Sequence, residues 1–173
     1  MIYGLVYLLF ITNVSANEKH NQLRTHEHGR GSFNMVIEGH HVNMELESSG
    51  SDIVGFEHNA KTKSQKTAIV NAKKKLEDIV NVAVLPAAAG CKLDNSKISL
   101  KEQAEKYEST HSEFFAEYEL VCSDPKKLTE ITFSYFNSFR NAETLDVNIV
   151  GPKSQKKFEV KRNFIKINLN GIF

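Results

Sequence analysis

The chain has little net charge and lacks a long internal hydrophobic run. Its 22 Lys and Arg residues are almost cancelled by 21 Asp and Glu residues. Nucleic acids and anionic membrane surfaces attract proteins with a clear positive excess, so the net charge favours neither as a partner. Apart from the amino terminus, no apolar stretch approaches the length of a transmembrane helix.

Sequence patterns typical of catalytic sites are also missing. The chain has no Gly-x-Ser-x-Gly nucleophile elbow, no glycine-rich phosphate loop, no His-Glu-x-x-His helix and no Cys-x-x-Cys redox pair. A hydrolytic zinc site assembled from scattered histidines is the remaining enzymatic alternative, but nothing identifies a general base beside an open coordination position. We therefore expect a protein that is not an enzyme.

The amino terminus carries the one prominent apolar run. Residues 2–14 are apolar but too few for a permanent anchor, and Val14-Ser15-Ala16 matches the small-residue pattern of signal peptidase. We expect residues 1–16 to be a cleaved signal peptide and residues 17–173 to form a single exported domain. Because no Lys or Arg precedes the apolar run, an uncleaved membrane anchor is the alternative.

Cysteine is scarce, with only Cys91 and Cys122 in the chain. In an oxidising compartment, an even pair at this separation predicts one disulfide bond. The alternative is a metal site with thiolate ligands. Zinc sites usually bring cysteines in close pairs such as Cys-x-x-Cys, and that spacing is absent.

Alternating apolar and polar residues predict several strands. Residues 32–38 and 42–47 alternate on either side of Gly39-His40, a pair that suits a tight hairpin turn. In contrast, residues 95–110 are polar and loosely patterned, which favours a short helix or an exposed connector. Phe114 to Cys122 is the clearest strand, and shorter strands are expected at 82–85, 131–135, 145–149, 158–160 and 165–169.

One segment has helical rather than strand periodicity. The apolar residues Ile69, Ala72, Leu76 and Ile79 recur at helical spacing. The start is marked by Thr62, which is followed three residues later by Gln65 in the pattern of a capping box. The expected fold class is therefore α+β, a single domain with a mainly antiparallel β-sheet and one principal amphipathic helix.

The seven histidines all lie between His20 and His111. Imidazole is a common zinc and copper ligand because its neutral ring nitrogen donates at the pH where most proteins work. His26 and His28 are two residues apart, so both rings point to the same side of an extended segment and can share a metal ion. Exposed terminal histidines with no function are the alternative.

Two further segments offer metal-ligating side chains. His111 and Glu113 have the same spacing at the start of the long strand, although a solvated strand face explains them equally. His58 ends an apolar stretch, a place where histidine is often a hydrogen-bonded structural residue. His40 and His41 are adjacent at the expected hairpin turn, and their side chains should diverge.

Five segments of the chain form a recognisable series. In chain order they are His26-Glu27-His28-Gly29, the hairpin from Ser32 to Glu47, Asp52-Ile53-Val54-Gly55-Phe56-Glu57-His58, Leu85-Pro86-Ala87-Ala88-Ala89-Gly90-Cys91 and His111-Ser112-Glu113-Phe114. These segments, in this order, resemble the ZrgA-like family of bacterial periplasmic zinc-binding proteins. The similarity spans nearly all of the chain after residue 16, and the segments that end at His58 and at Cys91 are the most specific.

The resemblance implies a periplasmic protein of a Gram-negative bacterium that binds Zn²⁺ and assists its acquisition. The implied partner is a high-affinity ABC importer, or the periplasmic zinc-binding component of that importer. As zinc ligands, the resemblance favours His26, His28, His58 and His111, with Glu113 and then Glu57 as further candidates.

In one respect the chain departs from this family. Members commonly carry a His- and acid-rich insertion before the His-Ser-Glu-Phe strand, whereas residues 96–110 contain no histidine. Two hypotheses follow. The chain retains an ordered zinc site without a flexible scavenging arm, or it is a β-rich interaction module in which metal binding is reduced or lost.

Overall fold

The computed structural model describes residues 28–104 and 110–173. The expected signal peptide and the histidines His20 and His26 lie outside the described residues. None of the described helices is both long enough and apolar enough to span a lipid bilayer.

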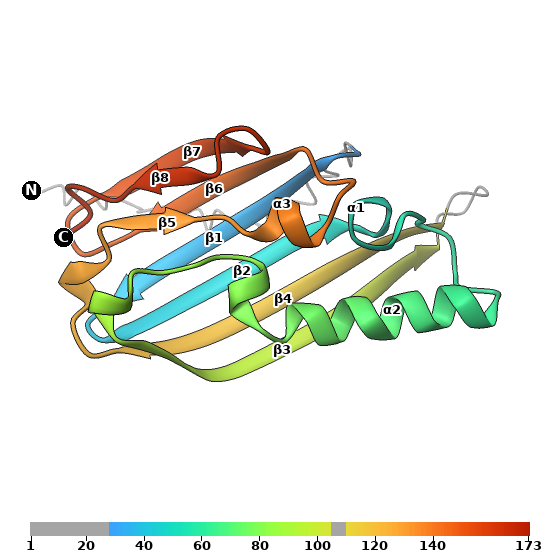
Figure 1. Cartoon of the computed structure of the whole chain (residues 1–173), viewed down its shortest axis with the longest axis horizontal. Coiled ribbons are helices and arrows are strands. Elements are labelled where there is room, and N and C mark those ends of the chain that lie inside the picture. The colour runs from blue at the N-terminus through green and yellow to red at the C-terminus, as the bar shows by residue number, and fades with distance from the viewer. Residues whose placement is uncertain (1–27, 105–109) are drawn as a thin grey trace, which may run out of the picture.

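A six-stranded sheet is the central element of the fold, and its strands follow the order β3-β4-β2-β1-β6-β7 (Figure 1). The pairing is antiparallel throughout except between β1 and β6, which run parallel. The expected α+β class is thus confirmed. The strand bounds are β1 Arg30–Glu38, β2 His41–Ser49, β3 Cys91–Ala104, β4 Thr110–Cys122, β6 Thr144–Val150 and β7 Gln155–Lys161.

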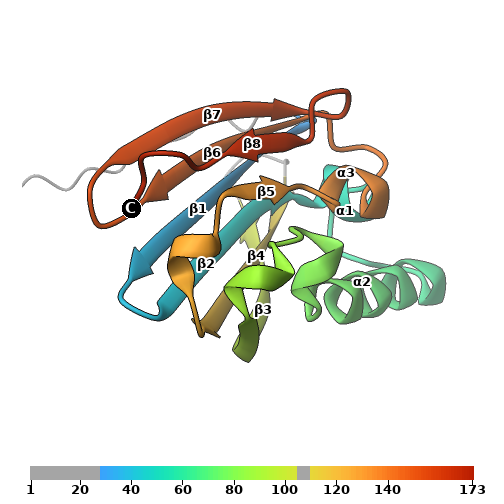
Figure 2. The ribbon, with the colours of Figure 1, turned by 60° about the vertical axis from the view of Figure 1, so that its left-hand side comes forward.

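Smaller elements cover one face of this sheet, as Figures 1 and 2 show. A second sheet of two short strands lies over the β1–β6–β7 side, and α2 lies over the side of β3 and β4. These elements are α1 Gly50–Val54, α2 Lys63–Leu76, α3 Tyr135–Ser138, β5 Glu130–Thr132 and β8 Lys166–Asn168, with short 3-10 helices η1 Ile79–Asn81, η2 Ala87–Ala89 and η3 Pro125–Lys127.

The hydrophobic core lies between the sheet and this cover. Alternate residues of the inner strands point into it, and the residues between them are polar and more exposed. The strand residues buried here are Phe33, Met35 and Ile37 of β1, Val42, Met44 and Leu46 of β2, Phe114, Ala116, Tyr118 and Leu120 of β4, and Leu145, Val147 and Ile149 of β6.

The predicted hairpin and helix are both confirmed. β1 and β2 pair around the two-residue turn at Gly39 and His40. At the start of α2, the Thr62 side chain accepts from the Gln65 amide while the Gln65 side chain accepts from the Thr62 amide. Leu76 at the end of α2 is buried, and its carbonyl accepts a hydrogen bond of 2.6 Å from the Tyr118 hydroxyl.

The prediction of a helix or connector at residues 95–110 was wrong for most of that segment, because β3 continues to Ala104. β3 is an edge strand with a single partner, β4, so much of it is exposed. Of the side chains in this stretch, Ile98 and Leu100 pack against the core. Two apolar residues among polar ones give little periodicity, whereas pairing with β4 supplies the backbone hydrogen bonds.

Two shorter strand predictions were also partly wrong. In the segment 82–85, Val84 makes only an isolated bridge to Thr132. The strand expected at 131–135 ends at Thr132, and Tyr135 begins α3 instead.

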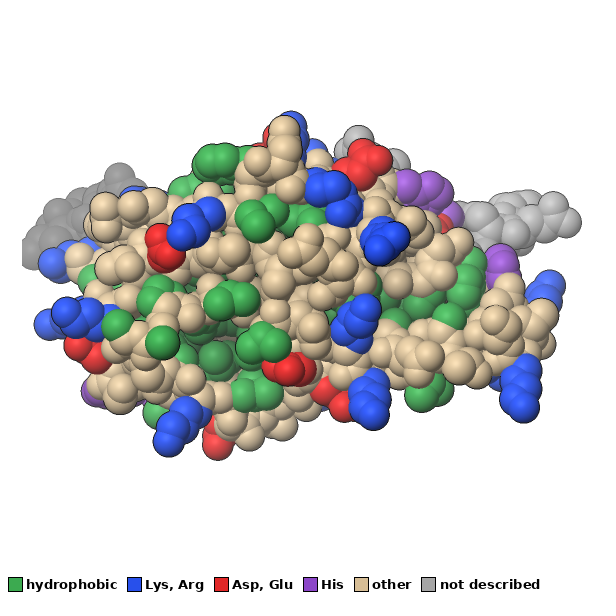
Figure 3. All heavy atoms as spheres, in the orientation of Figure 1, with side chains coloured by type: hydrophobic (Ala, Val, Ile, Leu, Met, Phe, Trp, Pro, Cys, Tyr) green, Lys and Arg blue, Asp and Glu red, His purple; other side chains and the backbone are tan. Residues whose placement is uncertain are grey.

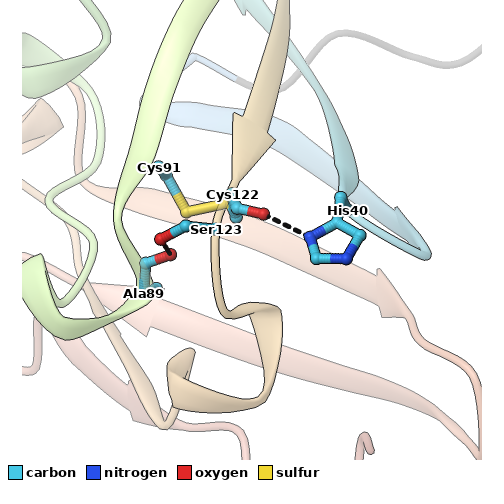
Figure 4. The surroundings of a disulfide bond; sticks show 5 residues. All are labelled: His40, Ala89, Cys91, Cys122 and Ser123. Carbon is cyan, nitrogen blue, oxygen red and sulfur yellow. Dashed lines mark hydrogen bonds between the residues drawn. A yellow bond between two sulfur atoms is a disulfide. The ribbon is translucent and has the colours of Figure 1, made fainter.

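The predicted disulfide between Cys91 and Cys122 is present and joins paired positions of β3 and β4. Its surroundings are shown in Figure 4, where Nδ1 of His40 lies 2.7 Å from the Cys122 carbonyl oxygen. The bond therefore ties the edge strand to its neighbour at the end of the sheet that carries the hairpin turn.

Candidate metal centre

The opposite end of the sheet brings together chain segments that are far apart in the sequence. β1 and β6 run parallel and both begin there, while β2 runs antiparallel to β1 and ends there. β4 runs antiparallel to β2, so it also begins at this end. His28 before β1, Glu57 after α1 and His111 in β4 consequently meet at the right-hand end of the sheet in Figure 1. Figure 3 shows histidine side chains on the surface of this end.

Glu57 is the centre of this cluster. Its Oε1 lies 3.2 Å from Nε2 of His28, and its Oε2 lies 2.6 Å from Nδ1 of His111. The Glu57 side chain is 11% exposed, against 33% for His111 and 68% for His28. One nearly buried carboxylate therefore contacts two imidazoles, one on each oxygen. The His28 side of this cluster is exposed to solvent.

The environment of Glu57 favours its ionised form. Burial is the largest influence and on its own would raise the pKa of Glu57, but the lowering effects of His111, His28 and Ser51 together outweigh it. The net result is a pKa of Glu57 below its ordinary value. At neutral pH the cluster thus presents a carboxylate between two imidazole rings, the donor types that zinc accepts.

The one-turn helix α1 carries the chain from β2 to Glu57. Ser49 caps its start by accepting from the Asp52 amide at 3.2 Å, and Gly55 ends it in the left-handed conformation with φ of 84°. At Gly50 only glycine fits, because a Cβ atom would lie 2.2 Å from Oγ of Ser112 and 2.6 Å from the Phe56 carbonyl oxygen. This close approach lets α1 sit directly against β4.

A pocket of about 270 Å³ opens beside the cluster. Its lining consists of His28, Gly29, Ser51, Asp52, Gly55, Asn141 and Glu143. Asp52 is 2% exposed, and its Oδ1 accepts the Gly29 amide at 2.8 Å while its Oδ2 has no hydrogen-bond partner within the protein. Burial raises the pKa of Asp52, although the Gly29 amide and the Ser49 and Ser51 hydroxyls partly offset that effect.

The structure gives different surroundings to the other predicted ligands His58 and Glu113, and His26 lies outside the described residues. His26 precedes the first described residue. The His58 ring stacks on Phe56 with centroids 5.1 Å apart, and its Nδ1 lies 3.0 Å from the Asn59 carbonyl oxygen. The Nε2 atom of His58 lies 3.5 Å from Nε2 of the Gln65 side chain. The His58 ring thus contacts its own loop and α2.

Glu113 lies in β4, two residues after His111, and is 5% exposed. Its backbone is in register with Ser49 of β2 and Lys101 of β3. Because side chains alternate along a strand, Glu113 lies on the same side of β4 as His111. His40 and His41 lie at the hairpin turn, at the other end of the sheet.

A protein-family model described as "ZrgA family zinc uptake protein" matches residues 25–169. The chain belongs to this family. The match covers all the strands and helices described above and all three residues of the His28–Glu57–His111 cluster. No curated protein matches the chain significantly. Zinc uptake is the role that the ZrgA family name gives, and the family resemblance seen in the sequence is confirmed.

The cluster of this ZrgA family member can be compared with the geometry that zinc requires. Two ligands bound at roughly 2.0–2.1 Å with a tetrahedral angle lie about 3.3 Å apart. The separation of 3.2 Å between His28 and Glu57 is close to this value, whereas 2.6 Å between His111 and Glu57 is shorter. Among residues 28–104 and 110–173, no three or more His, Cys, Asp or Glu side chains already have the arrangement of a metal site. Ligation therefore requires Glu57 and His111 to move apart by several tenths of an ångström.

The lowered pKa of Glu57 predicts how acid affects the stability of this protein. The Glu57 carboxylate stabilises the fold above its unfolded-state pKa of about 4.3, and this contribution is lost as the pH falls through the lower folded-state value. Wild type should therefore unfold at higher urea concentration than Glu57→Gln at pH 6, with a smaller difference at pH 3. An unchanged difference between the two pH values would show that the Glu57 charge does not stabilise the fold.

Sequence reasoning ranked Glu57 last among the candidates and missed Asp52, Asn141 and Glu143. A signal for Asp52 was present, because Ser49 and Asp52 have the Ser-x-x-Asp spacing that marks a helix start. Asn141 and Glu143 precede β6, and only the parallel pairing of β1 with β6 brings them beside His28. No local pattern indicates that pairing.

Proposed function

We propose that this ZrgA family member is a zinc-binding accessory protein, not an enzyme, that holds one zinc ion between His28, Glu57 and His111. The observation that carries the proposal is that both oxygens of the Glu57 carboxylate contact histidines from distant parts of the chain. A zinc site needs such a set of nitrogen and oxygen donors.

Zinc would take the place of the proton in the contact between Glu57 and His111. The 2.6 Å contact between Oε2 of Glu57 and Nδ1 of His111 needs a proton between nitrogen and oxygen. Oε1 of Glu57 has no hydrogen-bond partner among the described residues, although Nε2 of His28 lies 3.2 Å away. A zinc ion would attract all three groups at once and displace that proton. Three protein ligands leave a fourth position, which water or a further histidine would fill. His26 and His58, which the family resemblance favours, remain proposed ligands for it.

The ion is cargo in this proposal. His28 is the most exposed member of the cluster, so the ion stays within reach of solvent and of a receiving protein. An exposed site with one exchangeable position suits transfer better than permanent storage. The proposed recipient is the periplasmic zinc-binding component of an ABC importer.

A location in the periplasm is part of the same proposal. The disulfide between Cys91 and Cys122 supports it, because such bonds persist in oxidising compartments. The predicted signal peptide at residues 1–16 supports export by an independent route.

Calorimetric titration with zinc tests the proposal. At pH 7.5 we expect one ion per chain with micromolar or tighter affinity. At pH 5.5 the affinity should be at least about tenfold weaker, because imidazole protonates near pH 6.5 and protons then compete with zinc. A wild-type protein that takes up no zinc at pH 7.5 would contradict the proposal and favour the interaction-module hypothesis.

A further inference from the structure

We propose that Asp52 is a positioning residue for the zinc site: its carboxylate holds the backbone at Gly29 and thereby keeps His28 over Glu57. The inference rests on the proposed function and deepens it, because it names a residue that is not a ligand but controls one. The decisive contact is the hydrogen bond of 2.8 Å from the Gly29 amide to Oδ1 of Asp52, which is buried.

The Gly29 peptide is held from two sides. The Gly29 amide donates to the Asp52 carboxylate. The Gly29 carbonyl oxygen accepts from the backbone amides of Glu143 and Thr144, each at 2.8 Å. Gly29 has φ of 83°, a conformation that favours glycine, and a Cβ atom there would lie 3.3 Å from Cγ of Glu143. The chain is thus fixed at the residue directly after His28.

His28 itself has little packing to hold it. Its side chain is 68% exposed, its Nε2 lies 3.2 Å from Oε1 of Glu57, and it also interacts electrostatically with the Asp52 carboxylate. An exposed side chain samples several rotamers, so its position over Glu57 depends on the backbone that carries it. The nearest fixed backbone point is the Gly29 peptide.

Asp52 is itself held firmly. Its amide is capped by Ser49, and its Oδ1 lies 3.4 Å from the Ser51 hydroxyl, which also contacts Ser49. The Asn141 side chain donates to the Ser51 carbonyl at 2.9 Å and joins the start of β6 to α1. A buried acceptor on a braced helical turn can define the position of the segment that precedes β1.

A double-mutant cycle with zinc titration tests this role. We expect Asp52→Ala to weaken zinc binding about tenfold, in the range typical of residues that orient a metal ligand. In a His28→Ala background the same change should alter the affinity by less than about twofold, because the ligand that Asp52 positions is already gone. Asp52→Asn retains an oxygen for the Gly29 amide and should recover most of the affinity lost in Asp52→Ala.

The opposite results would overturn the inference. These are an unchanged affinity in Asp52→Ala, equal losses in Asp52→Asn and Asp52→Ala, or losses that add fully to those of His28→Ala. If Asp52→Ala does not fold, Gly29→Ala replaces it, since it strains the same peptide and should weaken binding only when His28 is present. Should zinc binding be indifferent to His28 and His111 themselves, the proposed function fails rather than the role of Asp52 alone.

Discussion

Replacing both His28 and His111 with alanine is expected to abolish zinc binding at this end of the sheet. Each substitution removes a nitrogen donor from the proposed His28–Glu57–His111 site, and the Glu57 carboxylate alone would hold zinc weakly in water. We expect each single variant to bind at least about a hundredfold more weakly than wild type, beyond the loss typical of residues that only orient a ligand. Zinc titration at pH 7.5 measures the effect.

His41→Ala is the matched control for that experiment. His41 is an exposed histidine at the hairpin turn, at the opposite end of the sheet from Glu57. Its removal should leave the zinc affinity unchanged and should leave the circular dichroism spectrum of the protein as it was. Unchanged affinity in the His28→Ala, His111→Ala double variant would place the zinc site elsewhere in the chain.

Replacing Cys91 and Cys122 with alanine is expected to lower the free energy of unfolding by about 3–4 kcal/mol. The bond closes a loop with a sequence separation of 31 residues, and in the chain-entropy model a loop of that size restricts the unfolded chain by this amount. Urea denaturation of the variant and of oxidised wild type measures the difference.

Reduced wild-type protein is the control for the disulfide variant. It lacks the bond but keeps both sulfur atoms, so it separates the effect of the cross-link from the lost packing of Cys122, which is fully buried. Because the bond and the Glu57 cluster lie at opposite ends of the sheet, zinc affinity should remain unchanged where the variant is folded. A stability loss below about 1 kcal/mol would show that the cross-link restricts the unfolded chain much less than the model requires.

Much of this fold could be predicted from the sequence because its inner strands bury one face. In β4, Phe114, Tyr118 and Leu120 lie on the buried side and charged residues lie between them, so alternation identified the strand. The part of β3 from Asn95 onward gave no such signal, since an edge strand with one neighbour needs few apolar residues. The parallel pairing of β1 with β6 depends on long-range contacts that local patterns do not encode.

Two of the three residues of the His28–Glu57–His111 cluster were expected from the sequence to lie together. Spacing and family resemblance pointed to His28 and His111, and the structure brings both to one carboxylate. Glu57 was underestimated because its importance comes from burial and from its two partners, neither of which is visible in a linear motif. Asp52 was not considered, since it contacts the backbone of Gly29 rather than offering an exposed ligand.

The most direct test of the central claim is a crystal structure of the zinc-loaded protein with anomalous diffraction recorded at the zinc absorption edge. We predict an anomalous peak at roughly 2.0–2.2 Å from a nitrogen of His28, a nitrogen of His111 and an oxygen of Glu57. A zinc ion bound only elsewhere, with both imidazoles still in contact with the Glu57 carboxylate, would contradict the account.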